Sequence, residues 1–193
     1  MSYPTGFKKE SGLGDVDASS YADDNDGAYY FTSSPYAAAW VAANAATKKE
    51  SLERATRLID SQFRFNGHRS TLTQALQWPR SGCREPDGTT AQFCLNNVAV
   101  TPREGTDFGF VPANVIPREI VIATIEMARE VTLADRTTAP VGEGLKYSNV
   151  GTTQTGYDKL DHRPIIPVHV QALLSKYGSM VNPKGGSVQL ARA

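Results

Sequence analysis

Residues 47–67 have the sequence TKKESLERATRLIDSQFRFNG, which is the clearest structural pattern in the chain. Thr47 and Glu50 have the spacing of a capping box, in which two side chains accept hydrogen bonds from each other's backbone N–H groups at a helix start. Gly67 is suited to end a helix. Between them, apolar side chains recur at helical spacing: Leu52, Ala55, Ile59 and Phe63. We therefore predict a long helix that begins at Thr47, with structural roles for Thr47 and Glu50.

A second long helix is expected after Pro117, because proline suits the first turn of a helix. A wide apolar stripe follows it, made of Ile120, Val121, Thr124, Ile125, Ala128, Val131 and Thr132. The two long helices are expected to pack against each other. Trp78, followed by the helix breaker Pro79, is expected to fill their junction from a loop, so both residues are predicted to be structural.

Shorter elements surround these two helices. Asp23 or Asp24 can cap a short helix, and Pro35 can open another that Asn44 closes. Residues 143–157 can form a two-stranded hairpin. A last short helix is expected over 168–177, ended by Gly178.

These elements predict a mainly α fold: a small helical bundle with two long helices, short flanking helices, a β-hairpin and extended N- and C-terminal arms. Residues 1–20 are expected to form a mobile or extended arm, residues 21–177 the helical domain, and residues 178–193 a polar tail. Residues 89–112 have only weak alternation and are expected to be irregular.

Charge and composition narrow the function. The chain has 193 residues, 20 basic and 20 acidic side chains and a formal net charge of zero. It therefore lacks the overall basic excess typical of proteins that grip nucleic acid without sequence preference. No apolar run approaches the ~20 residues of a membrane span, and the N-terminus shows no signal peptide pattern. We expect no membrane contact and a protein kept in cytosol-like conditions.

The charges are unevenly distributed along the chain. Residues 1–46 carry two basic and six acidic side chains, whereas residues 47–84 carry eight basic and three acidic ones. Such asymmetry suits head-to-tail contact between identical subunits, in which an acidic patch meets a neighbour's basic patch. The alternative is two solvated faces without a partner.

No motif predicts catalysis, a cofactor or a metal. The acidic run from Asp23 has Ala28 and Ser34 where an EF-hand loop needs glycine and glutamate. The three histidines lie in separate segments, and Cys83 and Cys94 do not have zinc-ligand spacing. We expect two free thiols rather than a bridge. No nucleophile elbow, phosphate loop or dinucleotide fingerprint occurs, so an enzyme is not expected.

A series of short segments resembles a known family. The specific ones are Ala55-Thr56-Arg57 with Ile59-Asp60, and the run Trp78-Pro79-Arg80-Ser81-Gly82. Compatible segments are Ser19–Phe31, Ala39-Trp40, Ile116-Pro117, the hairpin region and Arg163–Tyr177. Together, over about 20–177, they resemble the head-to-tail adaptor (connector) proteins of tailed bacteriophages, often labelled DnaT-like single-stranded-DNA-binding proteins. Residues 89–112 and the 178–193 tail extend beyond that pattern.

The resemblance implies a structural protein of the virion neck, made in the host cytoplasm. Its subunits would form a ring of twelve between the portal protein and the tail or tail-terminator protein, and double-stranded DNA would pass through without sequence-specific contact. The C-terminal segment would dock on the portal. The apolar side chains there must be covered either by the subunit's own core or by that partner; they are Val168, Val170, Leu173, Leu174 and Tyr177.

Two further residues are candidates for a surface role. Arg57 and Arg64 are seven residues apart, which predicts one face of the first long helix, facing a neighbouring subunit or the DNA channel. The competing function is single-stranded DNA binding, in which basic side chains would act together with tyrosine and tryptophan stacking platforms. Its candidate cations are Arg54, Arg57, Arg64, Arg69, Arg80 and Arg84.

Overall fold

The computed structural model describes residues 6–86, 109–138, 147–150, 153–156 and 163–181. Five helices lie within these ranges: α1 (Asp24–Phe31), α2 (Ala38–Ala42), α3 (Ala45–Gln62), α4 (Arg118–Leu133) and α5 (Val168–Leu174). Six short strands accompany them: β1 (Phe63–Phe65), β2 (His68–Arg69), β3 (Arg80–Ser81), β4 (Tyr147–Val150), β5 (Thr153–Gly156) and β6 (Gly178–Met180). The strands pair as β1–β6, β2–β3 and β4–β5, all antiparallel.

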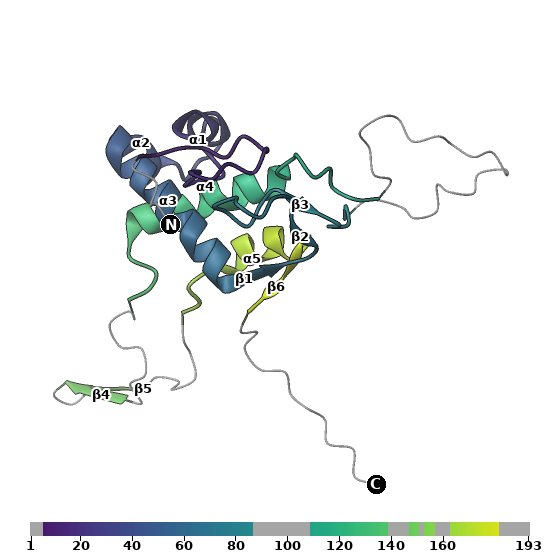
Figure 1. Ribbon diagram of the computed structural model, residues 1–193. Coiled ribbons are helices and arrows are strands. Elements are labelled where there is room, and N and C mark those ends of the chain that lie inside the picture. Colours follow the sequence, from purple (N-terminus) through teal and green to yellow (C-terminus); the bar gives the residue numbers. More distant parts are fainter. Residues whose placement is uncertain (1–5, 87–108, 139–146, 151–152, 157–162, 182–193) are drawn as a thin grey trace, which may run out of the picture.

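The predicted fold class was therefore wrong. The protein is a small mixed fold of helices and antiparallel strand pairs, not a helical bundle with two long helices (Figure 1). The physical reason lies at Phe63, where the chain leaves the helix and becomes extended, with buried Phe63 and Phe65 on either side of exposed Arg64. This alternation is the pattern of a half-buried strand.

The start of α3 also differs from the prediction. Asn44 is the N-cap, and its side-chain oxygen accepts a 2.8 Å hydrogen bond from the Thr47 backbone N–H. Thr47 and Glu50 thus lie within the helix and do not form its capping box. Asn44, expected to close the preceding helix, opens the next one instead. A capping box does occur in α1, between Asp23 and Asp26.

The core is built where α3 packs on α4. Leu52, Ala55 and Ile59 of α3 are fully buried, as are Ile120 and Met127 of α4. Each fully buried aliphatic side chain of this size contributes roughly 1.5–3 kcal/mol relative to an exposed one. The apolar stripe predicted to follow Pro117 is confirmed by this packing, and α4 begins directly after that proline.

Trp78 fills the core from a loop, as predicted, but the rings that it meets belong to β1 and the C-terminal segment rather than to the two long helices. Its side chain is fully buried and meets the rings of Phe65 and Tyr177 edge to face, each with centroids 5.8 Å apart. Pro79 is buried beside it, and the Trp78–Pro79 peptide bond is cis.

The C-terminal helix is shorter than predicted, and Gly178 does not end it. Helix α5 ends at Leu174, and Gly178 pairs with Phe65 in the β1–β6 ladder. A Cβ atom at Gly178 would lie 2.2 Å from the Arg64 carbonyl oxygen, so this close strand pairing requires glycine. The chain is therefore tied down as far as Met180, beyond the predicted start of the tail.

The region before residue 20 is packed rather than free. The Glu10 side chain is 2 % exposed, and its carboxylate accepts backbone hydrogen bonds from Gly12, Gly14 and Asp15. The backbone carbonyl of Asp15 in turn accepts a 3.0 Å bond from the Ala75 N–H, so residues 10–15 lie against the loop that joins β2 and β3. Residues 6–20 form an ordered part of the body, not an arm.

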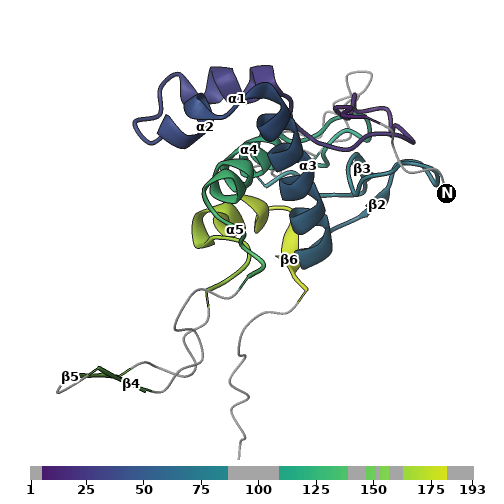
Figure 2. The ribbon, with the colours of Figure 1, turned by 90° about the vertical axis from the view of Figure 1, so that its left-hand side faces the viewer.

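The hairpin β4–β5 lies within the predicted range 143–157 and confirms that element. Residues 87–108 and 182–193, including Cys94 and most of the predicted tail, lie outside the described residues. In Figure 2, α1 and α2 lie at one side of the body, and the 6–20 loop with β2 and β3 lies at the other.

Candidate functional site

The two arginines predicted to share a helix face do not do so. Arg57 lies on α3, where its guanidinium is 4.0 Å from the Glu53 carboxylate. Arg64 lies in β1, beyond the end of the helix at Gln62, and its backbone pairs with Ser179. Both side chains are exposed, but they belong to different elements because the chain changes from helical to extended backbone between them.

Arg80, a candidate for DNA contact, is a structural residue. It is 7 % exposed, and its guanidinium donates hydrogen bonds to the backbone carbonyls of Gly67 (2.7 Å), Asn66 (2.8 Å) and Gln77 (3.1 Å). These bonds hold the β1–β2 turn against the loop that carries Trp78. Because they use most of the guanidinium N–H groups, few donors of Arg80 remain to bind a ligand. The exposed candidate cations are Arg54, Arg57, Arg64, Arg69 and Arg84.

The apolar side chains of the C-terminal segment mostly belong to the subunit's own core. Val170 and Leu174 are fully buried and Tyr177 is 4 % exposed. Leu173 is half-buried against the core, and Val168 is 72 % exposed. Of the two alternatives left open by the sequence, own core and docking partner, the structure shows the first for three of the five residues.

A buried polar network supports the Trp78 loop. The Tyr21 hydroxyl donates a 2.7 Å hydrogen bond to Asp60 Oδ1 and accepts bonds from the backbone N–H groups of Gln77 and Trp78. Asp60 Oδ2 accepts a further bond from Gln77 N–H. Burial raises the pKa of Asp60 to about 6, an effect that these hydrogen bonds and nearby Arg69 reduce.

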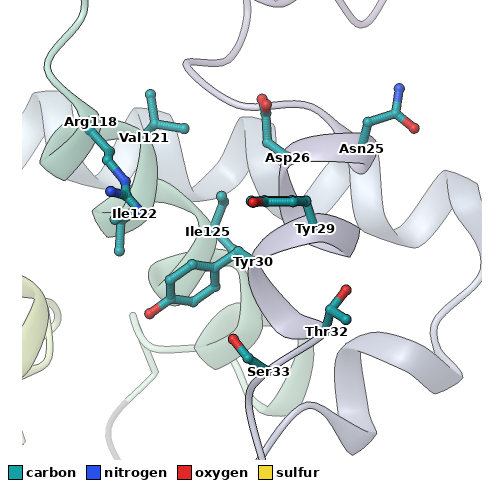
Figure 3. A pocket seen from close by; sticks show the side chains of 10 residues that line it. All are labelled: Asn25, Asp26, Tyr29, Tyr30, Thr32, Ser33, Arg118, Val121, Ile122 and Ile125. Carbon is teal, nitrogen blue, oxygen red and sulfur yellow. The ribbon is translucent and has the colours of Figure 1, made fainter.

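An open groove of about 760 Å³ lies between α1 and the first half of α4 (Figure 3). We call it the α1–α4 groove, and its lining residues are Asn25, Asp26, Tyr29, Tyr30, Thr32, Ser33, Arg118, Val121, Ile122 and Ile125. One wall carries the tyrosines of α1, and the other carries the aliphatic side chains of α4 with Arg118. The groove is thus mainly apolar, with polar groups at its rim.

The two tyrosines of the groove differ in freedom. Tyr29 is 85 % exposed, whereas the Tyr30 hydroxyl donates a 2.8 Å hydrogen bond to Glu126 Oε1. Partial burial, together with this bond, raises the pKa of Tyr30 to about 12. The Tyr30 side chain is therefore held in place as part of the groove wall, whereas the Tyr29 side chain is exposed and free to contact a ligand.

Carboxylates dominate the charge on the α1 side of the groove. Asp24 and Asp26 lie in the first turn of α1, with Asp23 as the cap, and the helix has no basic residue in its last turn. Lys9 lies 2.6 Å from Asp26 and 3.7 Å from Asp23. This acidic first turn complements the positive end of the helix dipole, and it would repel a phosphate.

Two groups of exposed apolar side chains lie at different places on the surface. Tyr29, Tyr36 (78 % exposed) and Val41 (70 %) belong to α1, α2 and their connection. A second group, which we call the Leu72 cluster, consists of Leu13 (74 %), Val16 (63 %) and Leu72 (102 %). Its loops lie side by side through the bond between Asp15 and Ala75, on the β2–β3 side of the molecule (Figure 2).

Sequence reasoning missed both the α1–α4 groove and the Leu72 cluster. The groove joins segments that lie far apart in the chain, so no local pattern predicts it. Leu72 did offer a usable indication, since it is a single leucine among Ser70, Thr71 and Thr73, where no core pattern explains it.

No metal or membrane site emerges from the described part of the chain. Within those ranges, no group of three His, Cys, Asp or Glu side chains is placed to hold a metal ion. Asp23 and Asp26, from the acidic run considered for calcium, cap α1 instead. Among the helices described, none combines the length and apolar character needed to cross a bilayer.

Comparison with known proteins identifies a family model that matches the first part of the chain. No curated protein and no solved structure matches. The matching family model covers α1, α2, α3 and β1–β3, and it leaves out α4 and α5. Over residues 7–92, the chain is similar to the family described as "Putative DnaT-like ssDNA binding protein".

Proposed function

We propose that this chain is a structural subunit that assembles head to tail with copies of itself, as in the adaptor ring between the portal and tail of a tailed bacteriophage. The observation that carries the proposal is the presence of two unlike exposed apolar surfaces on different sides of one small body, the groove side of α1 and the Leu72 cluster. Unlike surfaces on one subunit form heterologous contacts, which close into rings when the rotation permits.

The charge distribution supports the same proposal. The acidic first turn of α1 lies at one side, and exposed Arg64 and Arg69 lie in the strands β1 and β2. Opposite charges on different parts of the same subunit steer copies together in one orientation. The resemblance of the sequence adds the biological setting: a ring of twelve in the virion neck, a portal and a tail protein as partners, and double-stranded DNA in the channel.

The second candidate function is single-stranded DNA binding, and the family match over residues 7–92 favours it over the adaptor role. Tyr29 and Arg118 line one groove, where they could hold a stacked base and its phosphate. Three features of the structure weigh against it: the carboxylates beside Tyr29, the use of Arg80 within the fold, and the net charge of zero. Continuous strand binding needs cations along the path of the backbone.

One pair of measurements separates the two functions. The purified protein is titrated with a fluorescent oligo-dT at low and at moderate salt, and its mass is measured by sedimentation as a function of protein concentration. The adaptor proposal expects concentration-dependent assembly, rings in negative-stain images and only weak oligo-dT binding. Tight binding that weakens steeply with salt, by a monomer that never assembles, would overturn it and establish the second candidate.

A further inference from the structure

We infer that the α1–α4 groove is the socket for the Leu72 cluster of a second copy of this chain. The inference rests on the proposed head-to-tail assembly and names the contact through which it occurs. The groove and the cluster are two places where apolar side chains of the described residues gather at the surface, and they lie on different sides of the molecule.

The two surfaces have complementary shapes, since one is concave and the other protrudes. The groove is a concave site with Val121, Ile122 and Ile125 in its lining. Leu72 is fully exposed in a loop that joins two strands, and Leu13 and Val16 lie on the loop beside it. A protruding apolar side chain placed in such a hollow is the usual anchor of a protein interface.

The charges bordering the two surfaces also match. Arg69 is exposed and lies three residues before Leu72, so it would enter beside the cluster. The rim of the groove presents Asn25 and Asp26, and the Asp26 carboxylate already lies 2.6 Å from Lys9 of its own chain. A guanidinium from a second copy would add a second cationic donor to this half-exposed carboxylate.

The same rim disfavours single-stranded DNA as the occupant. A base stacked on Tyr29 would lie beside the Asp26 carboxylate, and Arg118 is the one arginine in the lining. A second copy brings an apolar anchor and a cation, so it satisfies the apolar wall and the rim together. We therefore assign the groove to a second copy of the chain, and the experiment below also detects the alternative, in which the groove binds DNA.

The test uses two full-length variants that each disable one surface. Leu72→Asp removes the anchor but leaves the groove intact, and Tyr29→Arg places a cation that repels Arg69 but leaves the anchor intact. Each variant alone is expected to weaken self-association by at least about tenfold, as judged by sedimentation. An equimolar mixture of the two is expected to form a dimer that cannot extend, because only one functional contact remains.

Matched controls come from neighbouring exposed residues. Thr73→Asp places the same charge beside the cluster, and Tyr36→Arg places the same cation near α1 but outside the groove lining. Both controls are expected to assemble like the unmodified protein. Thermal melts of all four variants should coincide with that of the unmodified protein, since each changed side chain is exposed.

A disulfide cross-link between two copies detects the proposed contact directly, even if the contact is weak. Proteins carrying Leu72→Cys and Tyr29→Cys are mixed and oxidised, and the disulfide dimer is expected only in the mixture. Dimers formed by Tyr29→Cys alone would show a two-fold contact between grooves and overturn the inference, as would a mixture that yields none.

The outcomes separate this inference from the function on which it rests. Rings that form normally from Leu72→Asp or Tyr29→Arg protein would overturn the assigned contact while leaving the adaptor proposal standing. Tight oligo-dT binding that Tyr29→Arg abolishes or strengthens, in a protein that never self-associates, would overturn both and assign the groove to DNA.

Discussion

Tyr21 and Asp60 share a hydrogen bond of 2.7 Å, and this contact joins the segment before α1 to the last turns of α3. The same two side chains accept the backbone N–H groups of Gln77 and Trp78. The loop that carries the largest buried ring of this region is thus held through two polar side chains rather than by regular secondary structure.

We predict that Tyr21→Phe destabilises the protein by about 1–3 kcal/mol, because it removes the hydrogen bond to Asp60 and leaves the backbone N–H of Trp78 without its acceptor. The Gln77 N–H keeps its bond to Asp60 Oδ2. Urea unfolding measures the change. Tyr29→Phe is the matched control, since the Tyr29 side chain is 85 % exposed, and it should shift the free energy of unfolding by less than about 0.5 kcal/mol. Equal effects for the two variants would disprove a structural role for the Tyr21 hydroxyl.

Asp60 should make stability depend on pH. Its pKa is raised from 3.8 to about 6 in the folded state, so the folded protein binds this proton more tightly than the unfolded chain does. The stabilisation that follows is fully present below pH 3.8 and is lost as the pH rises through about 6. Its size is of the order of 3 kcal/mol, because a tenfold difference in proton affinity between the folded and unfolded states corresponds to about 1.4 kcal/mol.

The measurement is the difference in unfolding free energy between the unmodified protein and Asp60→Asn over a pH range that spans the titration of Asp60. Carboxylates with lowered pKa values, such as Asp23 and Glu119, contribute equally to both proteins and cancel. We expect the unmodified protein to lose stability relative to the variant as the pH rises. A difference that does not change over this range would contradict the prediction.

Trp78→Ala should destabilise the protein by roughly 3–5 kcal/mol, the range for deletion of a large buried aromatic side chain. The ring is fully buried between Phe65 and Tyr177, so its loss opens a cavity at the point where β1 and the end of the C-terminal segment meet. Tyr36→Ala serves as the exposed aromatic control, and thermal unfolding compares the two. An unchanged melting temperature for Trp78→Ala would place the ring outside the core.

Two truncations should behave differently. Removal of residues 182–193 retains β6 and should leave the melting temperature close to that of the full chain. Removal of residues 178–193 also deletes the strand that pairs with Phe63–Phe65 and should lower it clearly. If both truncations melt alike, the β1–β6 ladder contributes little to stability.

The sequence predicted those elements whose information is local. The Asp23 cap, the apolar stripe after Pro117 and the hairpin at 147–156 each lie within a short window, and each is present. Trp78 is likewise buried as predicted, and the breaker Pro79 indicated that it lies in a loop. These features depend on propensity and periodicity, which neighbouring residues determine.

The failures have two physical causes. At the start of α3, Asn44 was expected to close the preceding helix, yet its side chain caps the helix that follows, so Thr47 lies within the first turn. At its end, Phe63 continues the helical stripe, yet it is buried in a strand whose partner, Gly178–Met180, has no apolar alternation. The sequence of neither segment alone therefore predicts that the two pair.

The candidate site was the least predictable part. Arg57 and Arg64 were separated by the unexpected end of α3, and three of the five docking candidates at the C-terminus proved to be core residues. The groove brings Tyr29 of α1 and Arg118 of α4, which are far apart in the sequence, into the lining of one site. The residues of an exposed surface follow no regular spacing in the sequence, so the surface can be recognised only in the folded structure.

The pairing of β1 with β6 also bears on how the protein is made. Phe63 leaves the ribosome long before Met180, its partner in the ladder, and more than half of the chain is synthesised in between. Until that strand emerges, the edge of β1 is open to other chains, and until Tyr177 emerges Trp78 lacks one of the two rings that it meets edge to face. The β1–β6 ladder therefore forms only after Gly178–Met180 has been synthesised, and until then the nascent chain presents an exposed edge that can pair with other chains.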